Sequence, residues 1–165
     1  MTIDWSLLTT KKQARCLQGF ACMDPGSHAD RPWEYQAQAA LRTCGQRLPE
    51  TAFILVGREE GDAVAACLLD ENVNGDGLEV FVYCAAVGVE RRNCGGHTAD
   101  LMVERLLRDC RERARAASCR RLMIRGKIHR ENRASQFLAK RFGLEPEPSY
   151  DGDYQYWVCA TDAAD

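Results

Sequence analysis

Several features of membrane, secreted and nucleic-acid-binding proteins are missing from this sequence. It has no run of about 18 apolar residues, the length that a helix needs to span a membrane. The formal net charge of −2 gives no reason to expect a general affinity for nucleic acid. No basic segment precedes an apolar one at the N-terminus, so we expect no secretory signal and a cytoplasmic protein.

A zinc-binding pattern is also missing, although the chain has nine cysteines. Zinc ligands commonly come in close C-x-x-C pairs, and the sequence contains none. The number of cysteines is odd, and most of them lie inside apolar patterns, where Cys behaves as a small hydrophobic residue. We therefore predict reduced thiols in the core and no metal site.

The sequence does contain enough apolar material for one folded domain. Its 165 residues are 45% hydrophobic and 28% charged, which is ordinary for a soluble globular protein. We therefore predict a single domain that covers residues 1–165.

The N-terminal part, residues 9–48, predicts two helices. Thr9 or Thr10 can cap a helix over residues 11–23, which Asp24-Pro25-Gly26-Ser27 then ends. A second helix is predicted over residues 33–48, where the apolar residues recur at helical spacing. Residues 2–8 are the candidate for a first strand.

From residue 51 the apolar pattern becomes strand-like. Residues 52–58, 63–69 and 78–87 are predicted strands, and Asn74-Gly75-Asp76-Gly77 is a hairpin signal. Their short polar connections favour an antiparallel meander. A helix from residue 97 to about 117 leads to a strand over 119–128, which should lie parallel to 78–87 by the right-handed crossover rule. A helix that ends at Gly143 and two last strands complete the pattern.

Residues 85–102 join an apolar strand, a basic turn with Gly95 and Gly96, and a helix. The first N–H groups of a helix have no partner inside it, and the helix dipole adds positive potential there. An anion such as a phosphate therefore binds readily at such a turn. Arg91 and Arg92 add positive charge. The alternative is an ordinary strand-to-helix turn with surface arginines.

This turn resembles the acyl-CoA signature of the GNAT N-acetyltransferase superfamily, Arg/Gln-x-x-Gly-x-Gly/Ala. Here the signature reads Arg92-Asn93-Cys94-Gly95-Gly96-His97, and it departs from the family pattern at His97. A second resemblance is Asn132, then a short helix with Ser135, then Gly143-Leu144. Both motifs occur in the family order, and the resemblance covers about residues 52–159.

The resemblance implies an α/β (α+β) fold with a mixed, mostly antiparallel central sheet and about four flanking helices. The sheet would splay between the strands over 78–87 and 119–128, and acetyl-CoA would lie in this cleft as cosubstrate. Its pyrophosphate would bind the backbone N–H groups of residues 93–98, and its pantetheine arm would pair with exposed backbone like an added strand. The implied cofactor-binding residues are Ala86, Val87, Val89, Arg92, Asn93, Cys94, Gly95, Gly96, His97, Thr98 and Asn132.

The implied reaction is direct attack of an amine on the thioester, and the amine must first lose a proton. Superfamily members often carry a glutamate base on the 78–87 strand, at a place that aligns here with Phe81. Glu79 is the candidate base one pleat earlier, and a surface carboxylate at a hairpin end is its alternative reading. Asp70 and Glu71 are further acids near the expected acceptor end. By the two-residue strand period, one face carries Glu79, Phe81, Tyr83, Ala85 and Val87.

Two further catalytic groups are implied. A bulge near residues 84–86 would turn one N–H toward the thioester carbonyl and stabilise the oxyanion. The leaving thiolate is commonly protonated in this superfamily by a Tyr, whose place here is taken by Ala139. Tyr83 is the candidate that replaces it. The remaining alternatives are solvent and Tyr150, Tyr154, Tyr156 and His129.

Two functions follow from these residues. The first is an acetyl-CoA-dependent N-acetyltransferase that acts on a primary amine of a small molecule or peptide, as a monomer or homodimer. The second is a non-catalytic acyl-CoA-binding sensor or interaction module, which the missing Tyr at Ala139 favours. In either case the helix start and the neighbouring arginines are expected to lower the thiol pKa of Cys94. A small residue that merely fits the turn is the alternative reading of Cys94.

Overall fold

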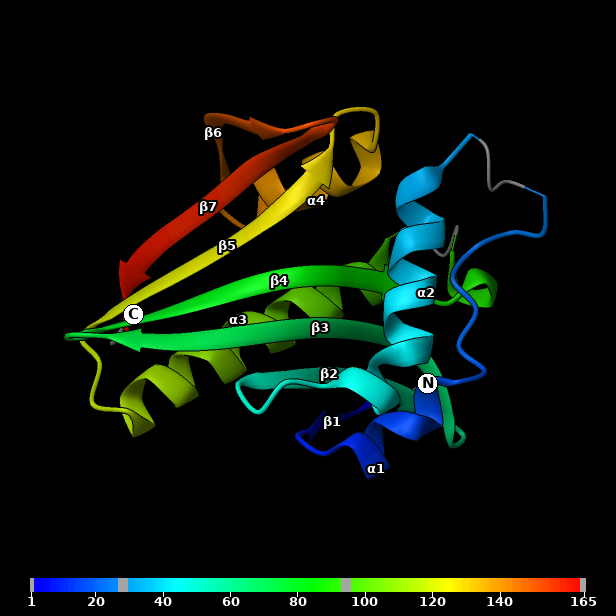
Figure 1. Cartoon of the computed structure of the whole chain (residues 1–165), viewed down its shortest axis with the longest axis horizontal. Helices are drawn as coiled ribbons and strands as arrows, with labels where there is room; N and C mark the ends of the chain where they lie inside the picture. Colours follow the sequence, from blue (N-terminus) through cyan, green and yellow to red (C-terminus); the bar gives the residue numbers. More distant parts are fainter. Residues whose placement is uncertain (1, 27–29, 93–95, 164–165) are drawn as a thin grey trace. The chain divides into compact units, whose positions relative to one another are not determined.

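The structure is a computed structural model that describes residues 2–26, 30–92 and 96–163. Its helices are α1 (Lys11–Ala14), the 3-10 helix η1 (Arg15–Leu17), α2 (Pro32–Arg47), the 3-10 helix η2 (Val89–Arg91), α3 (His97–Ala116) and α4 (Arg133–Arg141). Its strands are β1 (Asp4–Leu8), β2 (Ala52–Glu59), β3 (Asp62–Asn74), β4 (Gly77–Val87), β5 (Arg121–His129), β6 (Glu145–Asp151) and β7 (Tyr154–Asp162). Figure 1 labels these elements.

The strands form one mixed sheet in the order β1-β2-β3-β4-β5-β7-β6. The pair β4–β5 is parallel, whereas β1–β2, β5–β7 and β6–β7 are antiparallel. The predicted parallel neighbour of the 78–87 strand is therefore confirmed. The predicted fold class, a mixed and mostly antiparallel sheet flanked by four α-helices, is also confirmed for the described part of the chain.

The chain divides into two compact units, and β3 and β4 each contribute to both. The first unit comprises Met1–Leu69 and Cys84–Met102, and the second comprises Asp70–Tyr83 and Val103–Asp165. The first unit therefore holds the basic turn, and the second holds Glu79, Tyr83 and Asn132.

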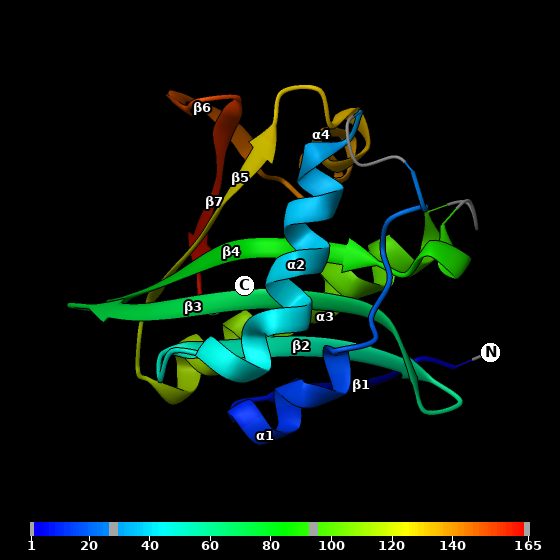
Figure 2. The ribbon, with the colours of Figure 1, turned by 45° about the vertical axis from the view of Figure 1, so that its right-hand side comes forward.

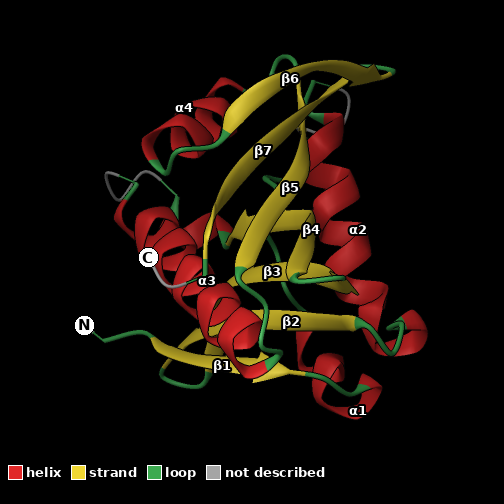
Figure 3. Cartoon of the chain, turned by 90° about the vertical axis from the view of Figure 1, so that its left-hand side faces the viewer, coloured by secondary structure: helices red, strands yellow, loops and turns green. Residues whose placement is uncertain are grey.

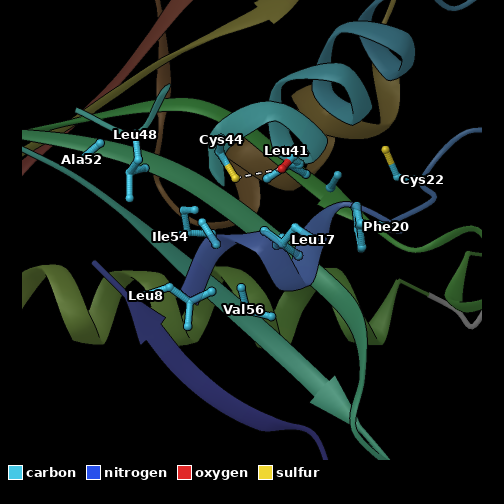
Figure 4. Packing of buried hydrophobic residues seen from close by; sticks show 13 residues of the cluster. Leu8, Leu17, Phe20, Cys22, Leu41, Cys44, Leu48, Ala52, Ile54 and Val56 are labelled. Carbon is cyan, nitrogen blue, oxygen red and sulfur yellow. Dashed lines mark hydrogen bonds between the residues drawn. The ribbon is translucent and has the colours of Figure 1, made fainter. Parts of the chain in front are cut away.

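The core of the first unit forms between β1, β2 and the helices α1, η1 and α2 (Figure 4). Leu41 of α2, Leu17 of η1 and Ile54 of β2 are all fully buried in it. Gly45 lets η1 approach α2, because a Cβ there would lie 3.2 Å from the backbone nitrogen of Arg15. In both Figure 1 and Figure 2, α2 lies over β2. This packing fixes the segment that leads from η1 into α2.

The first predicted helix, over residues 11–23, is wrong in length: helical structure ends at Leu17. Thr10 does cap it, and Gln13 completes a capping box. Beyond Leu17 the backbone bonds to other elements instead of continuing the helix. The Cys22 N–H donates to Gln38 Oε1 at 2.9 Å, and the Ala21 carbonyl accepts from Val89 N–H at 2.9 Å. Tertiary hydrogen bonds thus outweigh a helical pattern that contains Gly19.

The second unit contains the antiparallel β5–β7–β6 layer, which Figure 3 shows side by side. The pairing of β6 with β7 shifts register between Pro146 and Tyr150, consistent with a bulge beside the edge-strand prolines. Asn132 caps the start of helix α4, and its Oδ1 accepts from Ser135 N–H at 3.2 Å. The predicted stop at Gly143 is confirmed, since α4 ends at Arg141 and Gly143 has φ 78°.

The helices of the described residues include none with both the length and the apolar character that a bilayer crossing requires. The longest is α3, with 20 residues, and it carries many charged side chains.

Candidate active site

Strand β4 leads into the basic turn and contains one residue more than β3 beside it. The two-residue turn Gly75–Asp76 sets Asn74 opposite Gly77. At the other end, the Gly88 N–H donates to the Val64 carbonyl at 2.8 Å. Between these two points β4 advances 11 residues, from 77 to 88, while β3 advances 10, from 74 to 64. This difference is the count of a β-bulge.

The extra residue lies between Val82 and Ala86. The parallel ladder with β5 runs without a shift from Gly77↔Arg121 to Val82↔Gly126, so the irregularity comes later. Ala86 already shares the first unit's core with Ala66, and each of them lies two positions from a residue of the Gly88–Val64 hydrogen bond. The face predicted for Glu79 therefore does not extend to Ala85 and Val87, because a bulge interrupts the two-residue period.

The structure describes the basic turn except for its three central residues. Asn93, Cys94 and Gly95 lie outside the described residues. On the near side, Val89 N–H donates to Ala21, and Arg92 N–H donates to the Val89 carbonyl at 3.3 Å. The Val89 N–H is therefore already used within the first unit, and its carbonyl accepts one hydrogen bond there.

Both arginines of the turn are held by carboxylates that are largely shielded from solvent. The Arg91 guanidinium forms an ion pair with Glu59 of β2. Arg92 Nη1 lies 2.9 Å from Glu34 Oε2 of α2, and its Nη2 donates to the Cys22 carbonyl. The sequence pattern suggests that these arginines are added positive charge for an anion, but neither is unpaired. Nothing in the sequence spacing reveals these partners, because the members of each pair are far apart along the chain.

On the far side of the gap, helix α3 begins at His97. Gly96 has φ 77°, a left-handed conformation that glycine adopts without strain. The His97 side chain is exposed, whereas Thr98 is buried at 6% exposure. A helix of 20 residues thus starts here, with a positive dipole end at the predicted pyrophosphate position.

Glu79 and Phe81 lie two residues apart on β4 before the bulge, and Tyr83 follows at the same spacing. The rings of Phe81 and Tyr83 meet edge to face with centroids 5.0 Å apart, which shows that both lie on one face. Tyr83 is 56% exposed, and Glu79 is half-buried. In the parallel ladder, Glu79 lies opposite Met123 and Phe81 lies opposite Arg125.

The residues around Asn132 are more enclosed. His129 is buried at 6% exposure, its Nδ1 accepts from Glu131 N–H at 3.2 Å, and its ring meets Tyr154 edge to face. Burial, with the Asp153 carboxylate adding to it, raises the pKa of Tyr154. Ala139 is buried at 8% exposure on α4.

The eight cysteines of the described chain are free thiols, and five of them are buried. Burial raises the pKa of Cys22 to about 11 and that of both Cys84 and Cys110 to about 12. These thiols are therefore protonated and unreactive near neutral pH. Among the same described residues, no three His, Cys, Asp or Glu side chains gather as metal ligands would.

No model of a protein family matches this sequence, and no curated protein is similar to it. Solved structures, in contrast, match along nearly the whole chain. An acetyltransferase from Thermus thermophilus has a TM-score of 0.65 at 14% identity, covering 98% of this chain and 98% of that chain. The ribosomal-protein-S18-alanine N-acetyltransferase from Escherichia coli has a TM-score of 0.57 at 18% identity, covering 98% of this chain and 94% of that chain.

A third match was solved as a complex with coenzyme A. This PaiA N-acetyltransferase from Thermoplasma acidophilum has a TM-score of 0.56 at 13% identity, covering 96% of this chain and 98% of that chain. The chain therefore has the acyl-CoA N-acyltransferase fold of the GNAT acetyltransferases, as its two motifs predict.

Proposed function

We propose that this protein is an acetyl-CoA-dependent N-acetyltransferase that acts on a primary amine of a small molecule or peptide. The observation that carries the proposal is a strand with a bulge, a basic turn and a long helix in succession, within a fold that acetyltransferases share. One of these acetyltransferases is a complex with coenzyme A. We expect the protein to act in the cytoplasm, as a monomer or homodimer.

The proposed cofactor contacts centre on the start of α3. The pyrophosphate binds the backbone N–H groups of residues 93–98, where the helix dipole and the small residue Gly96 favour an anion. The pantetheine arm pairs with the backbone of Ala86 and Val87. The Val89 side chain and Asn132 make further contacts with the arm.

The proposed chemistry needs no covalent enzyme intermediate. The amine nitrogen attacks the thioester carbonyl, a C–N bond forms, and the C–S bond breaks as coenzyme A leaves. A backbone N–H at the β4 bulge stabilises the oxyanion. Glu79 takes the amine proton, directly or through water, and Tyr83 protonates the leaving thiolate. We favour transfer of the amine proton to Glu79 through water. Strand rise places the Glu79 Cα atom about 13 Å from that of Tyr83, the residue proposed to lie beside the leaving thiolate.

A non-catalytic acyl-CoA-binding module remains the second candidate. The observation that favours it is Ala139, a buried methyl group at the position where the superfamily commonly has a Tyr. A protein that binds acetyl-CoA without turning it over needs no acid at that position. The two candidates share the cofactor site and differ only in whether thiol is released.

A panel of amines tests the proposal directly. Purified protein is mixed with acetyl-CoA and with small-molecule amines or peptides that have a free N-terminus, and thiol release is followed with time. We expect release above the background of uncatalysed hydrolysis with at least one acceptor class. Binding of acetyl-CoA without release for any acceptor would instead support the non-catalytic module.

A further inference from the structure

The extended segment Phe20–Cys22 is held from two sides within the first unit. Helix α2 holds it through Arg42, whose Nε donates to the Phe20 carbonyl at 2.7 Å, and through Gln38, whose Oε1 accepts from Cys22 N–H. The chain that leads into the basic turn holds it through Val89, whose N–H donates to the Ala21 carbonyl at 2.9 Å. The segment therefore lies between α2 and the turn.

Arg92 and Glu34 add a further link between the turn, the segment Phe20–Cys22 and α2. The Arg92 guanidinium contacts the Cys22 carbonyl with one nitrogen and Glu34 Oε2 at 2.9 Å with the other. The Glu34 side chain is 10% exposed and that of Arg92 is 23% exposed, so solvent screens their attraction only in part. The second Glu34 oxygen accepts from Arg31 Nη1 at 3.3 Å. One carboxylate in the first turn of α2 thus fixes the arginine that opens the turn.

The position of this carboxylate has an electrostatic consequence. If Arg92 were a direct ligand of a pyrophosphate, a carboxylate 2.9 Å from it would compete with the phosphate and weaken binding. Removal of that charge would then strengthen binding of the anion. If Glu34 instead holds Arg92, and with it the backbone of the turn, removal of the charge would weaken binding. The two roles differ in sign.

We propose that Glu34 is a positioning residue for the cofactor turn and acts through Arg92. The inference rests on the proposed cofactor site. The ion pair also joins that turn to Phe20–Cys22. The Glu34–Arg92 pair therefore holds the cofactor turn and the segment Phe20–Cys22 as one body.

The first test is a calorimetric titration with coenzyme A and with acetyl-pantetheine, which lacks the pyrophosphate. We expect Glu34→Gln to weaken coenzyme A binding roughly tenfold, as for loss of a buried hydrogen-bonding partner, and to change acetyl-pantetheine binding much less. Equal or tighter binding of coenzyme A would overturn the proposal. Asp109→Asn is the matched control, because Asp109 is a 3% exposed carboxylate that accepts from Arg105 Nε at 2.8 Å.

A second variant covers the case in which Glu34→Gln does not fold. Arg92→Lys keeps the positive charge, but a single ammonium group cannot reproduce the guanidinium bridge between Glu34 and Cys22. Positioning predicts weaker coenzyme A binding in this variant as well. Undiminished binding would show that charge alone matters and would contradict the proposal.

Hydrogen exchange without ligand tests the link independently of the cofactor. The amides of Cys22 and Val89 should exchange faster in Glu34→Gln than in the parent, since both belong to the segment that the ion pair holds. Unchanged exchange would refute the positioning role even if coenzyme A binding were weakened. Failure of the parent to bind coenzyme A would contradict the proposed function, while the exchange result would still decide the role of Glu34.

Discussion

Glu79 lies opposite Met123 in the parallel ladder of β4 and β5. No ion-pair partner of Glu79 is found among the described residues, although nearby carboxylates have one. Glu147 accepts from Arg125 Nη2 at 2.6 Å, and Asp151 forms an ion pair with Lys127. Among the described residues, Glu79 is therefore half-buried and without an ion-pair partner, so its carboxylate is available to bind a cationic amine or to take its proton.

Replacing Glu79 by Gln tests its proposed role as a base. We expect kcat to fall about a hundredfold at pH 6, the usual contribution of a general base, and the loss to shrink toward pH 9 as more of the amine is already neutral. The measurement is the pH profile of kcat with a working acceptor. Glu145→Gln, an exposed carboxylate on β6, is the charge-matched control.

An unchanged kcat across this pH range would remove Glu79 as the base. If KM for the acceptor rose while kcat stayed constant, Glu79 would only attract a cationic amine. In either case the amine would lose its proton to solvent.

Thiol labelling tests the electrostatics of the turn. Cys94 lies outside the described residues, but the start of α3 is expected to lower its pKa. We expect a thiol reagent at pH 7.5 to modify Cys94 faster than Cys22, Cys84 and Cys110, whose pKa values burial raises to about 11 or 12. Bound acetyl-CoA should protect Cys94. Equal labelling with and without the cofactor would remove Cys94 from the site.

The buried thiols also predict how stability depends on pH. The pKa of Cys110 is about 12 in the folded protein, because of burial, and a thiol in the unfolded chain titrates at about 8.5. The folded state therefore binds more protons between these values. Its stability is fully present below the unfolded pKa and is lost as pH rises toward the folded pKa, by about 1.4 kcal/mol per pH unit for one such group.

Urea unfolding between pH 7 and 10 measures this loss. We expect Cys110→Ala to lower stability at pH 7, because it leaves a small cavity, but to flatten the decline above pH 9. Cys16→Ala is the control, since the Cys16 side chain is exposed. If the stability of Cys110→Ala declined with pH as steeply as that of the parent, groups other than Cys110 would cause the decline.

The sequence predicts well the elements whose signals are local. The helix over 33–48, the hairpin at residues 74–77 and the helix from His97 agree with the structure to within one or two residues. Each has a strong short-range signal, such as Pro32 at a helix start or a two-residue turn with glycine. The parallel pairing of β4 and β5 is also predicted, since the crossover rule depends only on the order of the elements.

The misses come from long-range contacts. The helix over 11–23 stops at Leu17, because Gln38 and Val89 take the hydrogen bonds of the following backbone. Arg91 and Arg92 are read as available charge, but Glu59 and Glu34 pair with them across the first unit. A single sequence gives no distance between such residues, and their side-chain roles depend on those distances.

Acetyl-CoA binding at the basic turn is the central claim, and calorimetry tests it most directly. The comparison is between the parent and Gly95→Glu, which places a side chain and a negative charge where the pyrophosphate should lie. Gly19→Glu is the matched control, because an added Cβ there would meet nothing within 4 Å. We predict saturable binding of acetyl-CoA to the parent and to Gly19→Glu, and at least roughly tenfold weaker binding to Gly95→Glu. No binding to the parent, or equal binding to parent and Gly95→Glu, would contradict the claim.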